Sequence, residues 1–470
     1  MSLVTPFLGL LLPWLVGVTM LLALRGKRAV TAPGELAWIL GAGYLIGAFA
    51  LTLWMRALSQ AGVGFGVIAI GAPLLALAAL FGYGARSGAK ALPAALRDSC
   101  RAVVAPAGLS GAARWAWWAL LAWIALRFLV LALEVLWQPL FPWNAWMQWA
   151  TKARVWFELG RIVPFGDRQA WLASDGAMYF DAAPHVPPTL PLLQVWASIA
   201  LGRWDDALMN WPWWQIAVAL ALAVYGALRA LAMSPLAALV VTFLASSLPL
   251  ANVNVALAGY PDLPLAACYA CSVLAFLRWA ETRGLPDAVT VVVLALACTQ
   301  ITAPGAAWAA TLVPGMIVVL LPKRGIRIAA AMISAILFGL LVLAQSSPTL
   351  FGHRLHLGFD PAWAMLGEGY FLLGSWNLLW YGVIAAALLA WRDLLSPPLA
   401  PLTMIVTAGV TLLFTLIAFP NARAVLADQP SIGRATLQFA PVLVVFGALA
   451  FRAFALRCAR EPASGQAQRA

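Results

Sequence analysis

Side chains that could perform chemistry gather in four short stretches of a chain that is otherwise apolar. The stretches are residues 141–185, the corner Tyr260-Pro261-Asp262, residues 353–368 and residues 423–434. All three histidines of the chain fall within them. A carboxylate can act as a general base on a hydroxyl group, and guanidinium groups bind phosphate through paired donors. The four stretches therefore predict a site that could hold a phosphate-bearing substrate beside a general base.

Ionisable groups within or next to a membrane are costly to keep there, which makes them functional candidates. Our candidate substrate-binding residues are Lys152, Arg154, His185, Tyr260, His353, Arg354, His356 and Arg434. Plainer explanations stay open for several of them. Lys152 and Arg154 could extend to lipid headgroups, and Arg434 could be a headgroup anchor. Asp262 could be an N-cap or a helix-dipole partner.

His353 and His356 are three residues apart and could share one face of a helix. A divalent metal would need further ligands, and the sequence identifies none. We therefore expect no cofactor, and a divalent metal at these histidines stays the less favoured alternative.

The composition predicts an all-α polytopic membrane protein. The chain is 64% hydrophobic and 10% charged, with a mean hydropathy of +0.90. Apolar runs near 20 residues recur along its length, which suits helices that cross about 30 Å of hydrocarbon. The strand alternation of a membrane barrel is absent. The net charge of +12 sits mostly in short connections between runs, so it does not indicate a nucleic-acid partner.

Basic clusters set the expected topology, because Lys and Arg favour cytoplasmic connections. A single alternation of about 13 spans places every basic cluster inside, with the N-terminus in the periplasm and the C-terminus in the cytoplasm. The expected spans are 7–24, 35–56, 63–83, 115–137, 208–229, 235–254, 262–280, 287–302, 305–321, 328–345, 371–390, 399–419 and 436–456. Residues 187–202 are apolar but too short for a comfortable span, so we expect a juxtamembrane or re-entrant helix there.

The outer stretch 141–196 is long for a connection and rich in tryptophan, which argues for a folded cap rather than disorder. The spacing of Trp143, Trp146 and Trp149 fits an amphipathic helix lying in the membrane interface. An aromatic belt explains the same rings equally simply.

The order of several motifs resembles the GT-C superfamily of integral-membrane glycosyltransferases, which use polyprenyl-phosphate-linked sugars. The motifs are Trp143-Asn144-Ala145-Trp146, Trp149, Lys152-Ala153-Arg154, Pro187-Pro188 with Leu190-Pro191-Leu192-Leu193, Gly259-Tyr260 with Asp262 and Pro264-Leu265-Ala266, and Arg434 with Leu437 and Pro441. The resemblance is closest to bacterial members with extra amino-terminal spans. It implies a three-span addition (1–113), a GT-C-like core (114–456) with an outer loop (138–207), and a cytoplasmic tail (457–470).

The resemblance also implies an inverting transferase in the bacterial inner membrane. It would move a sugar from a polyprenyl-phosphate donor to a lipid or glycan acceptor at the periplasmic face. Asn144 stands where the family's catalytic aspartate is expected, and an amide cannot take a proton at neutral pH. Asp262 and Asp181 are the substitutes we consider first. The alternative is an altered GT-C-like protein that acts as a lipid-linked-glycan binder, flippase or assembly partner.

Overall fold

The computed structural model describes residues 4–26, 32–86, 90, 92–104, 106, 108–346, 349–350, 353–354, 358–361, 363–419 and 432–467. Helices account for nearly all the regular structure of these residues, and the strands in them form two short pairs. The predicted all-α class is confirmed for this part of the chain.

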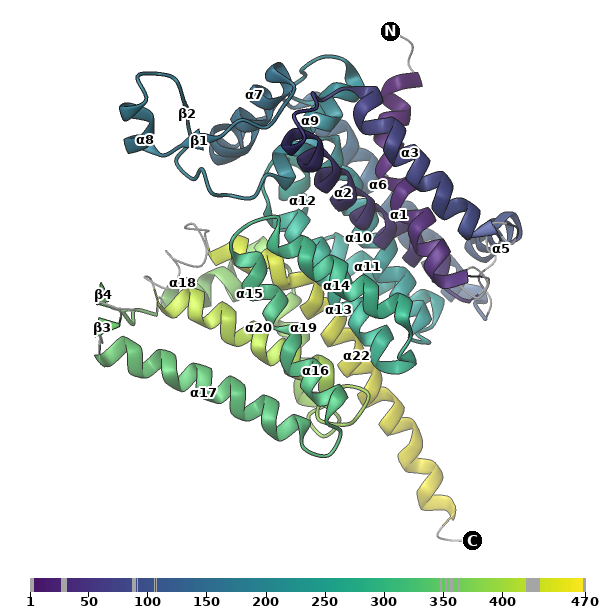
Figure 1. Cartoon of the computed structure of the whole chain (residues 1–470). Coiled ribbons are helices and arrows are strands. Elements are labelled where there is room, and N and C mark those ends of the chain that lie inside the picture. The colour runs from purple at the N-terminus through teal and green to yellow at the C-terminus, as the bar shows by residue number, and fades with distance from the viewer. Residues whose placement is uncertain are drawn as a thin grey trace. The chain divides into compact units, whose positions relative to one another are not determined.

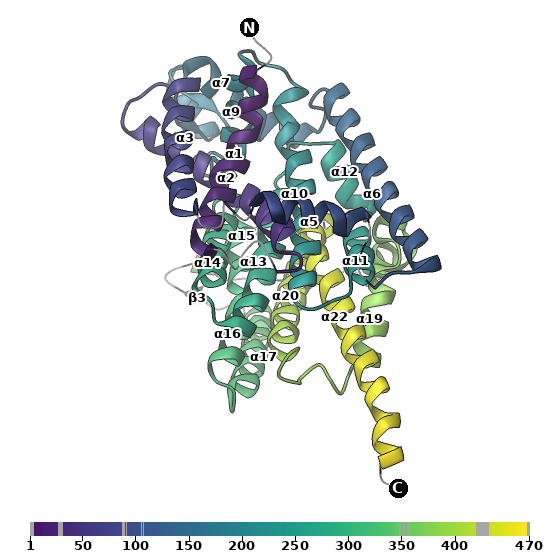
Figure 2. The same ribbon diagram turned by 90° about the vertical axis from the view of Figure 1, so that its right-hand side faces the viewer.

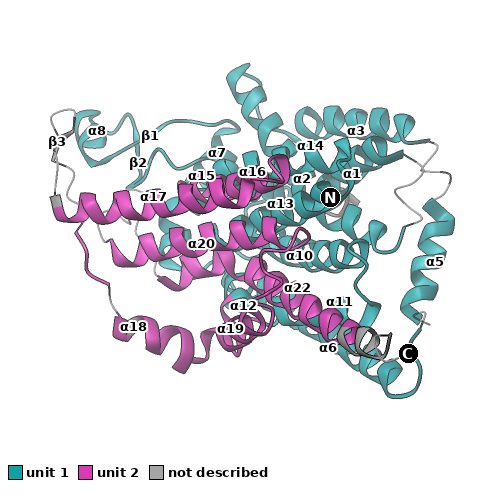
Figure 3. Ribbon diagram, turned by 90° about the horizontal axis from the view of Figure 1, so that it is seen from below, with its two compact units in different colours: residues 1–247, 251–302 teal, residues 248–250, 303–470 magenta. Residues whose placement is uncertain are grey.

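The helices form two compact units. The first contains residues 1–247 and 251–302, and the second contains residues 248–250 and 303–470 (Figure 3). The domain boundaries at 113/114 and 456/457 follow from the resemblance to a protein family, not from which residues pack together. The two compact units do not test these boundaries, which stay a prediction.

The first unit is a bundle of long apolar helices with one crosswise helix (Figure 1). Residues 138–210 form the tryptophan-rich outer insert. The other helices of this unit are α1 (Val4–Arg25), α2 (Glu35–Gln60), α3 (Val67–Gly84), α5 (Leu92–Val104), α6 (Gly111–Trp137), α10 (Trp211–Ala230), α11 (Pro235–Ser246), most of α12 (Pro249–Ala256), α13 (Asp262–Thr282) and α14 (Leu285–Thr299). Helix α5 is the crosswise one and connects α3 to α6 (Figure 2).

Helices α1 and α2 pack with their backbones almost touching. A Cβ atom on Gly17 would lie 1.7 Å from the carbonyl oxygen of Gly43, and one on Gly47 would lie 1.8 Å from that of Pro13. Small residues at such crossings let membrane helices gain van der Waals contact along their backbones. Gly17 of α1 and Gly43 and Gly47 of α2 are therefore the reason that the two helices can lie so close together.

A closed network of four buried charges holds one end of the first unit together. Arg25 Nη1 donates to Glu35 Oε2 at 2.9 Å, and Arg278 Nε donates to Asp287 Oδ1 at 3.0 Å. Arg25 also pairs with Asp287, and Arg278 with Glu35. These residues lie near the end of α1, the start of α2, the end of α13 and the start of α14. The four helices therefore alternate in direction, as the predicted topology assumes.

The tryptophan-rich insert is folded along its whole length. Its elements are η2 (Ala145–Ala150), α7 (Thr151–Leu159), β1 (Phe165–Gly166), α8 (Arg168–Ala173), β2 (Tyr179–Phe180), α9 (Thr189–Leu201) and η3 (Leu208–Asn210). Strands β1 and β2 pair in parallel, with Phe165 opposite Tyr179. Asp167 caps α8 by accepting a hydrogen bond from the backbone N–H of Ala170 at 2.9 Å. Helix α9 has 13 residues, too few for a straight span, which agrees with the short helix expected at 187–202.

The expected continuous span 235–254 is broken. Helices α11 and α12 meet at an angle of 62°. Pro249 has no backbone N–H and disfavours the helical conformation at Leu248, so the helix stops before it and restarts in a new direction.

The second unit is also helical. Its elements are α15 (Pro304–Ala310), α16 (Leu312–Leu320), α17 (Gly325–Ser346), β3 (Thr349–Leu350), β4 (His353–Arg354), α18 (Trp363–Gly367), η4 (Glu368–Leu372), η5 (Gly374–Trp376), α19 (Leu379–Leu389), α20 (Ala400–Ala418) and α22 (Ile432–Ala467). Trp308 lies in its core, where its ring stacks on Phe439 with the centroids 5.3 Å apart. The indole N–H of Trp308 donates to Gln438 Oε1 at 2.6 Å, which satisfies the one polar atom of that ring.

Eight helices in the described residues are long and apolar enough to cross a membrane, and the bent pair α11–α12 makes a ninth if it is one span. The other four expected spans coincide with shorter apolar helices, namely α1, α14, the pair α15–α16 and α19. The chain is thus a helical membrane protein in its coarse features, and the count of 13 stays a prediction.

Candidate functional site

The insert begins with exposed aromatic rings on both sides of Asn144. The side chains of Trp143 and Trp146 are 69% and 51% exposed, and Asn144 is exposed between them. Trp149 is buried, so the expectation that all three tryptophans share one interfacial helix face is wrong for this ring. Residues 145–150 form a π-helix, whose wider turn changes the angle between residues three apart.

The corner at residues 259–262 packs directly against the start of the insert. Gly259 has a φ of +107°, and a Cβ atom there would lie 2.9 Å from both Ala145 Cβ and Leu140 Cδ1. The ring of Tyr260 meets that of Trp149 edge-on, with the centroids 6.3 Å apart. Only glycine fits this combination of backbone conformation and close approach. Two stretches far apart in the sequence are therefore one assembly in the structure.

Asp262 is completely buried in the first turn of α13. The N-cap of this helix is Pro261, so the explanation of Asp262 as an N-cap is wrong. Its carboxylate does lie at the positive end of the helix dipole, where a negative charge is stabilised.

Asp181 is engaged in a buried ion pair with Lys152, and both side chains are at most 3% exposed. Lys152 Nζ also donates to the carbonyl oxygen of Ala183 at 3.0 Å, and the backbone N–H of Ala183 donates to Asp181 Oδ1 at 3.1 Å. Because the lysine is buried, the explanation that it extends to lipid headgroups is wrong. The pair fastens the 160–183 segment to α7, and this geometry favours a structural part for Asp181.

Arg154 and His185 are exposed on the same insert. The Arg154 guanidinium lies 5.8 Å from the centre of the Trp204 ring, a cation–π distance that holds the side chain near the surface. His185 lies just before α9. Both remain accessible to a ligand.

Arg56 is a cation that the sequence analysis did not select. Its Nη1 donates to Gln300 Oε1 at 2.7 Å, and its Nη2 donates to the hydroxyl of Thr189. The half-buried guanidinium joins the last turns of α2, the residue after α14 and the first residue of α9. The signal that could have revealed it is an arginine near the end of a predicted apolar span.

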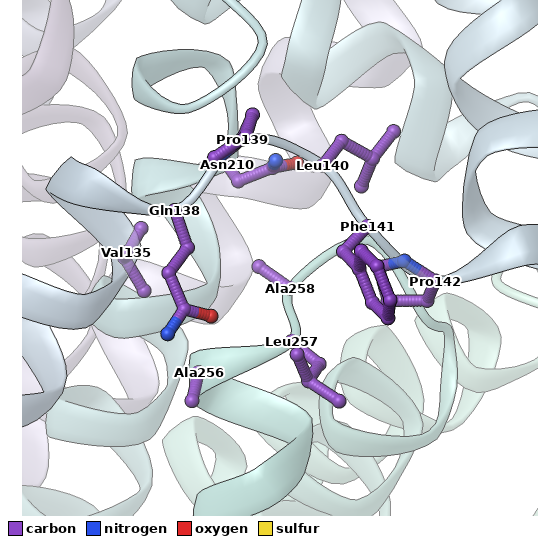
Figure 4. A pocket seen from close by; sticks show the side chains of 10 residues that line it. All are labelled: Val135, Gln138, Pro139, Leu140, Phe141, Pro142, Asn210, Ala256, Leu257 and Ala258. Carbon is purple, nitrogen blue, oxygen red and sulfur yellow. The ribbon is translucent and has the colours of Figure 1, made fainter.

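A small cavity lies beneath the first residues of the insert (Figure 4). Leu140, Gln138 and Asn210 are among its lining residues. The Asn210 amide is held in place, because it accepts a hydrogen bond from Gln194 Nε2 at 2.9 Å and donates to the Asp206 carbonyl at 3.0 Å. Leu140 also faces Gly259, so the cavity adjoins the corner.

A larger, mostly apolar groove lies between α6, α10, α11, α12 and the first turn of α13, and it is lined by Phe128, Leu131, Ala217, Leu220, Ala221, Val224, Ala245, Ser246, Ala251, Asn252, Val255 and Leu263. Beside it, Arg127 Nε donates to Asn252 Oδ1 at 3.0 Å. Arg127 is near the middle of the 27-residue helix α6, and its guanidinium has no second partner within the described part of the chain. It is a second cation within a predicted span that the sequence analysis did not select.

The remaining candidates belong to the second unit. His353 and Arg354 form strand β4, so the expectation of a helix face at His353 is wrong. His356, Arg423 and Asp428 lie outside the described residues. Arg434 is in the first turn of α22 and is partly exposed.

Near the start of the same helix, the hydroxyls of Tyr370 and Thr436 lie 2.8 Å apart. Burial raises the pKa of Tyr370 to about 12.

No group of three or more histidines, cysteines or carboxylates in the described residues is arranged to hold a metal ion. Comparisons with models of protein families, with curated proteins and with solved structures found no match to this chain.

Proposed function

We propose that this protein is a membrane glycosyltransferase of the GT-C type. It would transfer a sugar from a polyprenyl-phosphate donor to a lipid or glycan acceptor at the periplasmic face of a bacterial inner membrane. The observation that carries the proposal is the packing of the corner on the insert, with Tyr260 against Trp149 and Gly259 against Ala145. These two stretches carry most of the GT-C resemblance.

The proposed reaction needs a general base on the acceptor hydroxyl. The base removes the hydroxyl proton as the oxygen attacks the anomeric carbon, and the bond from that carbon to the phosphate oxygen breaks with inversion. Asp262 is our candidate, although its burial means that the corner must open for an acceptor to reach it. Asn144 is exposed and could donate a hydrogen bond to the sugar.

The departing phosphate needs cations. Arginine suits this task, because it stays charged and offers paired donors. Arg154 is accessible on the insert, and Arg56 is held at the start of α9. The groove beside Arg127 is apolar, as a polyprenyl chain requires. Arg434 enters the proposal through the resemblance alone.

The test is transfer by the purified protein across a panel of polyprenyl-phosphate sugars. We expect Asp262→Asn to lower the rate by about 10²–10⁴-fold, the usual contribution of a general base. Arg434→Ala should also abolish transfer. Asp205→Asn is the matched control, because Asp205 pairs with an arginine that is 69% exposed, and this variant should keep the full rate. The absence of both binding and turnover with every donor in the panel would contradict the proposal.

A second candidate function is a lipid-linked-glycan binder, flippase or assembly partner that has lost its base. The observations that favour it are the amide at Asn144, the burial of Asp262 and the pairing of Asp181 with Lys152. Under this proposal, Asn144→Asp should create transfer activity in a protein that otherwise only binds the donor. Robust turnover by the unaltered protein would eliminate it.

A further inference from the structure

Helix α5 presents an apolar stripe that the described residues of the first unit leave exposed. Leu96, Val103 and Val104 are 45%, 40% and 62% exposed. At about 100° per residue, these side chains and that of Cys100 fall on one side of the helix. Ala95, about 80° from Val103 around the helix, is buried against the protein. The exposed stripe thus begins beside the buried edge of α5 and continues around the helix away from it.

Positive charge borders the stripe. Arg97 and Arg101 follow it around the helix, and both are exposed. Helix α5 lies at the centre of the connection 84–114. This connection contains one acidic residue, Asp98, and five exposed basic residues, Arg86, Lys90, Arg97, Arg101 and Arg114. The surface around α5 is thus both apolar and cationic.

The ends of two candidate membrane spans fix the position of α5. It follows α3 and precedes α6, and the indole N–H of Trp117 in α6 donates to the Val103 carbonyl at 2.9 Å. Figures 1 and 2 show α5 lying crosswise near the end of the first unit where α1 finishes. Trp115, at the start of α6, is 78% exposed, as expected of a ring at a membrane surface.

We propose that α5 is an in-plane helix that binds anionic phospholipids of the cytoplasmic leaflet. Leu96, Val103 and Val104 enter the acyl-chain boundary, while Arg97 and Arg101 bind the headgroup phosphates. An apolar stripe flanked by cations matches such a surface in both respects. This proposal is independent of the glycosyltransferase proposal.

The experiment uses Cys100 as a reporter. Cys100 and Cys458 are exposed, whereas Cys268, Cys271 and Cys298 are buried, so a full-length Cys458→Ser variant can be labelled at Cys100 with an environment-sensitive fluorophore. The labelled protein is placed in vesicles of equal parts phosphatidylcholine and phosphatidylglycerol, with bromine on the chains of one lipid or the other. Brominated phosphatidylglycerol should quench the label more strongly than brominated phosphatidylcholine.

The ratio of the two quenching constants measures lipid preference. Each arginine near an anionic surface is expected to contribute about fivefold, so Arg97→Gln with Arg101→Gln should remove most of the preference. Arg161→Gln with Arg168→Gln, on the outer insert, is the control and should leave the ratio unchanged. Equal quenching by both lipids would overturn the proposal. So would a label that neither lipid quenches, because the stripe would then be covered by a second copy or another protein segment.

Discussion

At the scale of single residues, the pairing of Lys152 with Asp181 changes how the insert is understood. Both residues were selected from the sequence as parts of a site, and the structure joins them in a buried pair. Removing one partner of such a pair leaves an uncompensated charge, whereas replacing both with apolar side chains costs much less. The pair therefore offers a direct test of whether it fastens the insert.

Lys152→Met alone should destabilise the insert by about 3–5 kcal/mol, the range for breaking a buried ion pair. Lys152→Met with Asp181→Leu should be less destabilising than either single change. Limited trypsin digestion followed by mass spectrometry can measure this, because Arg161 and Arg168 are exposed on the segment that the pair holds. Cleavage at those sites should be fastest in the single variants. Equal cleavage rates in all variants would show that the pair does not hold the segment.

The sequence singled out polar residues along the insert and at the corner as candidates, but it did not indicate their partners. Arg56 and Gln300 are 244 residues apart, and no local pattern relates them. Arg127 and Asn252 are likewise brought together only by the packing of α6 beside the broken helix. The corner was predictable as a motif, whereas its contact with the insert depends on Gly259, whose positive φ has no signature beyond the residue type.

At the scale of elements, the network of Arg25, Glu35, Arg278 and Asp287 should control how firmly four helices hold together. Glu35→Gln leaves two buried guanidinium groups with one carboxylate. We expect a loss of about 3–5 kcal/mol, seen as a lower midpoint of thermal unfolding in detergent.

The matched control for this network is Asp205→Asn, since its ion pair with the exposed Arg203 is worth at most about 1 kcal/mol and an asparagine Oδ1 can still accept from the backbone N–H groups of Ala207 and Leu208. Its unfolding midpoint should stay close to that of the unaltered protein. If both variants unfold at the same temperature, the network is not a main source of stability.

Element positions followed well from hydropathy, because a run of about 20 apolar residues has few alternatives to a helix. Helices α2, α6, α13 and α20 lie close to their expected ranges. The break between α11 and α12 was missed, since the apolar run continues through Pro249 without a change in composition. Helix α5 was not predicted either, because its composition is mixed and not uniformly apolar. Its mixture of arginines and apolar residues resembles a connection until the 3.6-residue period is traced around the helix.

At the scale of the whole molecule, the predicted topology places both exposed cysteines on the cytoplasmic side. Cys100 lies on α5, and Cys458 lies near the end of α22. A membrane-impermeant maleimide should label both in inverted membrane vesicles, Cys100 more slowly than Cys458 because its side of α5 faces the lipid boundary, and neither in intact spheroplasts. The single variants Cys100→Ser and Cys458→Ser show which cysteine reacts. Labelling of one cysteine from each side would mean that the number of spans between them is not as predicted.

The four-charge network also bears on how the chain is made. Arg278 follows Glu35 by 243 residues, so the α1–α2 hairpin is synthesised long before its partners. Each hairpin brings one cation and one anion to the network, α1–α2 with Arg25 and Glu35, and α13–α14 with Arg278 and Asp287. Each can therefore enter the bilayer with its own network charges balanced. The later hairpin completes the network when Arg25 pairs with Asp287 and Arg278 pairs with Glu35. During folding, two hairpins whose network charges are already balanced associate, and no unpaired charge has to remain in the bilayer before they do.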